Sequence, residues 1–141
     1  KEIEKLQRTF SFTRTDSGQA NSLTITDEVK LTAGGAFETA LISCSRYSVR
    51  ESETDIALTV GEGEKAVKIT VSATQSDKPL PLRFVTQKIE EDASSRFDTQ
   101  TVTNDASAGI KPVRLGFRIA EAVSDAKMTM VIGASTTTHT Q

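Results

Sequence analysis

Three short segments in the first third of the chain decide its fold: RTFSFTR (Arg8–Arg14), LTITDEV (Leu23–Val29) and FETALIS (Phe37–Ser43). Each segment alternates apolar and polar residues, which is the period of a β-strand with one dry face and one wet face. Clusters of Gly, Asn and Ser, which favour turns, separate the segments. The pattern predicts an antiparallel sheet built from local hairpins, with Gly34–Gly35 closing the second hairpin and Phe37–Ser43 as a central strand.

Further alternating segments follow along the rest of the chain. They are centred on Tyr47–Val49, Ile56–Val60, Val67–Ala73, Leu82–Ile89, Val113–Ile119 and Met128–Ile132. About nine short strands without a convincing helix are typical of an antiparallel β-sandwich, with a closed barrel as the alternative. We expect an all-β sandwich domain over residues 1–134 and a frayed, Thr-rich tail over residues 135–141. The polar stretch Glu90–Gly109 predicts a long surface loop with one short strand at Thr99–Thr103.

Length and charge limit the classes of function. A chain of 141 residues and 15.2 kDa is one domain of ordinary size, which needs no disulfide or metal to fold. The 17 Lys and Arg against 19 Asp and Glu give a net charge of −2, so we expect no nucleic-acid partner. No apolar run approaches the roughly 18 residues of a membrane span, so we expect no membrane partner. The chain begins at Lys1 rather than Met, which predicts a processed product or a piece of a larger protein.

The residues that could carry catalysis are scattered along the sequence. The only histidine, His139, lies two residues from the end, and the only tyrosine, Tyr47, lies in a predicted strand. The carboxylates of Glu90–Asp92, and those of Glu62 and Glu64, could serve glycoside hydrolysis or Ca²⁺ binding, but neither group has the spacing of an EF-hand loop. We therefore predict no catalytic residue, no metal site and no cofactor for this chain.

Packing explains the remaining notable side chains better than binding does. The single cysteine, Cys44, follows apolar residues, so a small buried side chain is expected. Asp27 interrupts an apolar strand face, and a buried carboxylate needs a partner, which Arg8 or Arg114 could supply. The phenylalanines at apolar strand positions are expected in the core rather than on a sugar-stacking platform: Phe10, Phe12, Phe37 and Phe117.

The order of these segments resembles the C-terminal β-rich region of heparinase II/III-like polysaccharide lyases. That region carries an Arg-x-Phe strand, a Leu-Thr-Val-x-Asp strand and a Phe-Glu-Thr-Ala-Leu strand. Similar sequence motifs occur here at Arg8–Phe12, Leu23–Val29, Phe37–Ile42, Gly63–Val71, Ile89–Glu91 and Lys111–Ile119. The resemblance covers about four-fifths of the chain.

The resemblance implies a parent enzyme in which an α-helical toroid precedes β-sandwich layers. Such enzymes cleave uronate-containing polysaccharides by β-elimination, in the bacterial periplasm or outside the cell. The family's catalytic Tyr and His residues lie mostly in the toroid and the central β layer, and neither Tyr47 nor His139 matches them. The chain is therefore expected to be a non-catalytic module whose partners are the α-toroid domain and an acidic polysaccharide.

Two other functions fit the same composition. A free-standing carbohydrate-binding module would expose a row of aromatic side chains on one sheet face. A structural subunit of a pilus or phage particle would self-assemble, or would offer an open sheet edge to a strand of its neighbour.

Overall fold

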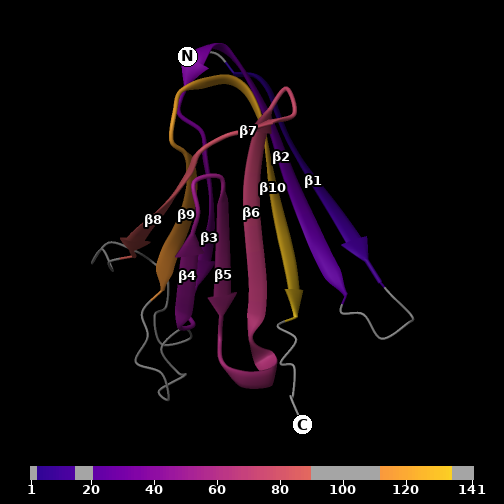
Figure 1. Cartoon of the computed structure of the whole chain (residues 1–141), viewed down its shortest axis with the longest axis vertical. Helices are drawn as coiled ribbons and strands as arrows, with labels where there is room; N and C mark the ends of the chain where they lie inside the picture. The colour runs from indigo at the N-terminus through magenta and orange to yellow at the C-terminus, as the bar shows by residue number, and fades with distance from the viewer. Residues whose placement is uncertain (1–2, 15–20, 90–111, 135–141) are drawn as a thin grey trace, which may run out of the picture.

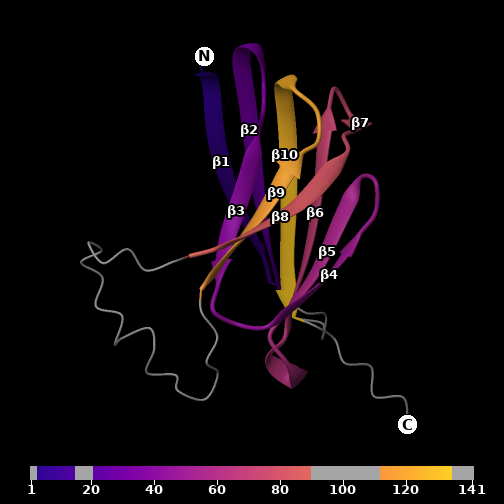
Figure 2. The ribbon, with the colours of Figure 1, turned by 90° about the vertical axis from the view of Figure 1, so that its left-hand side faces the viewer.

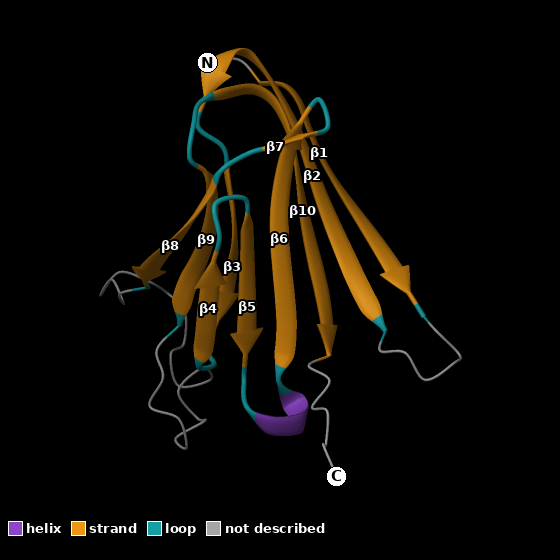
Figure 3. Ribbon diagram, viewed as in Figure 1, coloured by secondary structure: helices purple, strands orange, loops and turns teal. Residues whose placement is uncertain are grey.

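Two antiparallel β-sheets make up the computed structural model, which describes residues 3–14, 21–89 and 112–134 (Figure 1). These residues form ten strands and one short 3₁₀ turn, Gly63–Lys65, but no α-helix (Figure 3). The prediction of an all-β sandwich is confirmed, with ten strands where about nine were expected. The described part of the chain has no helix of the length and apolarity needed to cross a membrane. The predicted loop at 90–109 and the tail at 135–141 lie outside the described residues.

The two sheets differ in width. The larger one has the strand order β1 (Ile3–Thr13), β2 (Ser22–Gly35), β10 (Val123–Ala134), β6 (Val67–Gln75), β5 (Asp55–Val60), β4 (Tyr47–Glu51), and the short β7 (Lys78–Pro79) also pairs with β6. The smaller sheet has the order β3 (Glu38–Ser43), β9 (Val113–Ile119), β8 (Leu82–Lys88). Three strands therefore face a sheet of seven.

The core lies where the smaller sheet covers the larger one. Its largest fully buried side chains are Phe117, Ile56, Leu58, Leu115, Ile119, Met128, Val71 and Val123. They alternate with outward-facing residues along β5, β6, β9 and β10, as the period-two pattern predicts. Burial of these apolar side chains is the main force that holds the two sheets together.

The pairing of the first three strands differs from the prediction of consecutive hairpins. β1 and β2 do form a hairpin, with Phe10 opposite Ile25 and Arg8 opposite Asp27. The second predicted hairpin is wrong, because β2 continues to Gly35 and the chain then crosses to the other sheet, where β3 pairs with β9. β3 is consequently an edge strand rather than a central one. Alternation identifies a strand but not the sheet to which it belongs.

Burial corrects three further predictions. Phe10 and Phe12 are 63% and 65% exposed rather than buried, and Cys44 is exposed as well. Phe117 is fully buried and Phe37 packs against the core, as expected. Phe10 and Phe12 do lie on the strand face that continues the core face of β2, but no strand of the smaller sheet covers them. Cys44 lies just beyond the end of β3, where the packed layer has ended.

Truncation of Phe117 tests where the core lies. We expect Phe117→Ala to lower the free energy of unfolding by about 3–5 kcal/mol, because it leaves a cavity in the centre of the sandwich. Ile42→Ala is the matched control, since Ile42 is on the neighbouring strand but is 68% exposed. Its cost should stay within about 0.5 kcal/mol in urea denaturation at pH 7. Equal costs for the two variants would contradict the assignment of the core.

Candidate functional site

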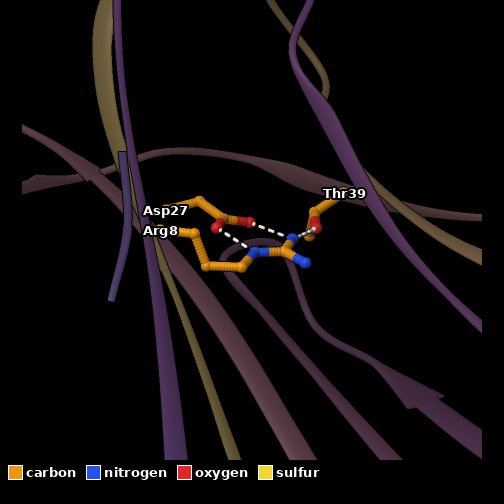
Figure 4. Close-up of polar contacts among 3 residues, drawn as sticks. All are labelled: Arg8, Asp27 and Thr39. Atoms are coloured by element: carbon orange, nitrogen blue, oxygen red, sulfur yellow. Dashed lines mark hydrogen bonds and ion pairs between the residues drawn. The ribbon is translucent and has the colours of Figure 1, made fainter. Parts of the chain in front are cut away.

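A three-residue polar cluster joins the two sheets at one side of the sandwich (Figure 4). Arg8 on β1 donates from Nε to Asp27 Oδ1 at 2.6 Å and from Nη2 to Asp27 Oδ2 at 2.7 Å. The same Nη2 donates to Thr39 Oγ1 on β3 at 2.8 Å. The guanidinium thus binds one carboxylate in a bidentate manner within the larger sheet and also reaches across to the smaller sheet.

Asp27 is the best-shielded carboxylate of the described chain. It is 5% exposed, and hydrogen bonds from Arg8 hold its pKa below its ordinary value, although burial acts in the opposite direction. The prediction that Asp27 is buried and paired is confirmed, and its partner is Arg8. The other candidate, Arg114, binds Glu38 instead. The cluster is fully paired, so it stabilises the fold and offers no free base or nucleophile.

The cluster lies at the margin of a side on which the sandwich is open. Ile3, Leu6, Phe10 and Phe12 of β1 are each 60–65% exposed, and their cross-strand partners on β2 identify their common face as the core-facing one. In Figure 1, β1 and β2 lean away from β3 toward the lower right of the view. We call these four apolar residues, together with the free edge of β3, the open side.

The opposite side is closed by hydrogen bonds. On β8, the backbone N–H of Leu82 donates to the carbonyl of Glu53 at 3.1 Å, and that of Phe84 donates to Glu51 Oε1 at 3.0 Å. The ring of Tyr47 on β4 contacts that of Phe84 edge to face, with centroids 5.9 Å apart. The edge of β8 is therefore covered, whereas no described strand pairs with the outer edge of β3.

The outer face of the smaller sheet carries a second polar cluster. Glu38 on β3 accepts hydrogen bonds from Arg114 and, at 2.7 Å, from Arg118, both on β9. Burial acts to raise the pKa of Glu38, but the two arginines outweigh it and hold that pKa below its ordinary value. Gly116 lies between the two arginines, and a Cβ there would come within 2.7 Å of Glu38 Oε1. The glycine thus provides the space in which the ion pairs lie on the sheet.

Positive charge exceeds negative charge on this outer face. Arg83 of β8 is opposite Arg118 in the sheet register and makes no ion pair with any described residue. Beside Arg114 lies an open depression lined by Thr86, Gln87, Lys88 and Ile89. We call the surface formed by Arg83, Arg114, Arg118 and Glu38 the basic face; it carries three cations and one carboxylate.

The residues that the sequence suggested for catalysis do not come together. Tyr47 packs against Phe84, and Glu62 forms an exposed ion pair with Arg46 at 3.5 Å. Glu64 lies in the exposed 3₁₀ turn. Glu90–Asp92 and His139 lie outside the described residues. Within the described ranges, no group of three or more His, Cys, Asp or Glu side chains is placed to hold a metal ion.

Sequence reasoning missed the basic face, although a signal for it was present. The segment Arg114-Leu115-Gly116-Phe117-Arg118 places two arginines and a glycine on the face opposite Leu115 and Phe117. Knowing that β3 is the neighbour of β9 would have added Glu38 between them. Comparison with known proteins identifies no relative, since no protein-family model and no curated protein matches the chain.

Replacing Asp27 tests the inter-sheet cluster. Asp27→Asn should lower the free energy of unfolding by about 1–3 kcal/mol at pH 7, because it removes a buried charge-assisted pair. The folded state lowers the pKa of Asp27, so this contribution is full above the unfolded pKa of about 3.9 and is lost as the pH falls through the folded value. Urea denaturation from pH 7 down to pH 2 should therefore show the difference between wild type and variant shrinking.

The control for this test is Glu28→Gln, which removes an exposed ion pair with Lys5 in the same two strands. Exposed pairs contribute little, so its effect should be the smaller one at pH 7. A difference between wild type and Asp27→Asn that grows in acid would contradict the pairing described here.

Gly116→Ala tests the space beneath the Glu38 ion pairs. The new methyl group would also lie 3.0 Å from the backbone oxygen of Val85, so relief requires a shift of the strand. We expect a loss of about 1–3 kcal/mol in unfolding free energy. Gly133→Ala is the matched control on β10, where the nearest atom is 3.7 Å away and the change should be tolerated. Equal stability of the two variants would argue against the close packing at Gly116.

Proposed function

We propose that this chain is a non-catalytic C-terminal β-sandwich module of a heparinase II/III-like polysaccharide lyase. In the parent protein, periplasmic or extracellular, it supports the catalytic α-toroid domain and lines part of the polysaccharide groove. The sequence resemblance suggests the family, and the basic face is the single structural observation that supports the role. An acidic polysaccharide carries carboxylate or sulfate groups, which guanidinium groups bind well.

Two arginines of the basic face are preorganised to bind such a ligand. Arg114 and Arg118 each use hydrogen-bond donors toward Glu38, yet their side chains remain 35% and 52% exposed, with further N–H groups available. Glu38 fixes the two guanidinium groups, so a ligand would lose less affinity through ordering them. Arg83 on the neighbouring strand β8 adds a cation that forms no ion pair with any described residue. This arrangement favours the binding of an anionic polysaccharide rather than its cleavage.

A free-standing carbohydrate-binding module is the second candidate. It is favoured by Phe10 and Phe12, which are exposed at alternate positions of one strand face, as a sugar-stacking row would be. Their neighbours on β2 are Ile25 and Leu23, so the surroundings are more apolar than polar. This setting suits another protein layer better than a sugar, which needs hydrogen-bonding groups beside the ring. Neutral glycans that bind through Phe10 and Phe12 would support this candidate.

The test measures binding and turnover separately. With heparan sulfate, hyaluronan and alginate we expect no rise in unsaturated-uronate absorbance, but salt-sensitive binding in calorimetry or affinity chromatography. Arg83→Ala should weaken binding several-fold, because it removes the one arginine of the basic face that has no ion pair with a described residue. Lys78→Ala, an exposed lysine on β7 away from the basic face, should bind as wild type does.

Clear turnover of any of the three polysaccharides would refute a non-catalytic module. Binding that is absent, or that is equally reduced by Arg83→Ala and Lys78→Ala, would refute the role of the basic face.

A further inference from the structure

We propose that the open side is completed by a second copy of this chain, in a closed two-fold dimer where β1 of each copy pairs with the free edge of β3 of the other. This inference goes beyond the lyase proposal and does not depend on it. It rests on two unpaired strand edges and one uncovered apolar row that lie on the same side of the molecule.

The unpaired strand edges are those of β1 and β3. Within the described residues, β1 pairs only with β2, and β3 pairs only with β9. The hydrogen bond from Ile119 N–H to the Phe37 carbonyl sets the alternation along β3, so the backbone groups of Glu38, Ala40 and Ile42 point away from β9. An exposed edge of this kind is a template for another strand.

The uncovered apolar row lies on β1. This row faces the layer that the smaller sheet occupies, but the smaller sheet does not extend far enough to cover the row. Its members are Ile3, Leu6, Phe10 and Phe12. The contact from Arg8 to Thr39 shows that β3 is the strand of the smaller sheet nearest to this row. A strand added to the free edge of β3 would therefore lie over the uncovered face of β1 and β2 (Figure 2).

A second copy supplies that strand and gains the same contact in return. When β1 of the partner lies beside β3, two-fold symmetry places β1 of the first copy beside the partner's β3, so both edges on both copies become paired. The two apolar rows then face each other between the layers. Such a contact is closed, because neither copy keeps an edge to which a third could add on this side.

The buried area and the charge are suitable for a dimer. Four apolar side chains exposed by 60–65% present on the order of 400–500 Å² per copy, and two paired strand edges add to it. The sum approaches the roughly 800 Å² per partner of a stable interface. The only charged pair in the row, Arg8 with Asp27, is already neutralised, so two identical faces do not repel each other.

The experiment is light scattering coupled to size-exclusion chromatography, over a range of chain concentrations. We expect a mass twice the 15.2 kDa of the chain at micromolar concentrations. Phe10→Glu should shift the mass to that of a monomer, because it places an unpaired charge in the contact. Ser11→Glu is the matched control on the outer face of the same strand and should remain dimeric. Circular dichroism shows that each variant is folded.

A second variant tests the strand pairing itself. Ala40→Pro removes a backbone N–H that points away from β9, so it should leave the smaller sheet intact while abolishing the dimer. A monomeric wild type, or a dimer that survives both Phe10→Glu and Ala40→Pro, would overturn the proposal. A mass that keeps rising with concentration would also overturn it, in favour of an open chain of subunits.

Discussion

A sheet of three strands cannot cover a sheet of seven, and the other features of this molecule follow from that constraint. The apolar residues of β5, β6, β9 and β10 are sequestered because the two sheets overlap there. Those of β1 are not, although they have the same alternation and continue the same face. The molecule therefore has a packed core, a side closed by hydrogen bonds from β8, and a side that is open at β1 and β3.

The position of the Arg8–Asp27–Thr39 cluster follows from the incomplete cover of the larger sheet. At the boundary between covered and uncovered surface, a purely apolar contact between β1 and β3 would be incomplete. A bidentate pair that also reaches Thr39 fixes the relative position of the two sheets at this boundary. The Asp27 side chain is only 7% exposed, which shields the pair from salt, while the Arg8 side chain stays 45% exposed and needs no full desolvation.

Local pattern predicts some of this structure and misses the rest for identifiable reasons. Strands such as Val67–Gln75 and Val113–Ile119 are evident, because alternation and branched side chains are properties of single segments. A partner for Asp27 was predictable from the cost of burying a lone carboxylate. Whether β3 joined β2 or β9, and whether a layer extended over Phe10, depend on contacts between distant segments. The same limit hid the basic face, since Glu38 and Arg118 become neighbours only through the pairing of β3 with β9.

The central claim is that the smaller sheet covers Phe117 but stops short of Phe10 and Phe12. Nuclear Overhauser contacts of the phenylalanine rings, filtered for contacts within one chain, test this most directly. The account predicts contacts from the Phe117 ring to buried side chains of the larger sheet, and none from the rings of Phe10 or Phe12 to β8 or β9 of their own chain. Intramolecular contacts between either of those two rings and β9 would contradict it.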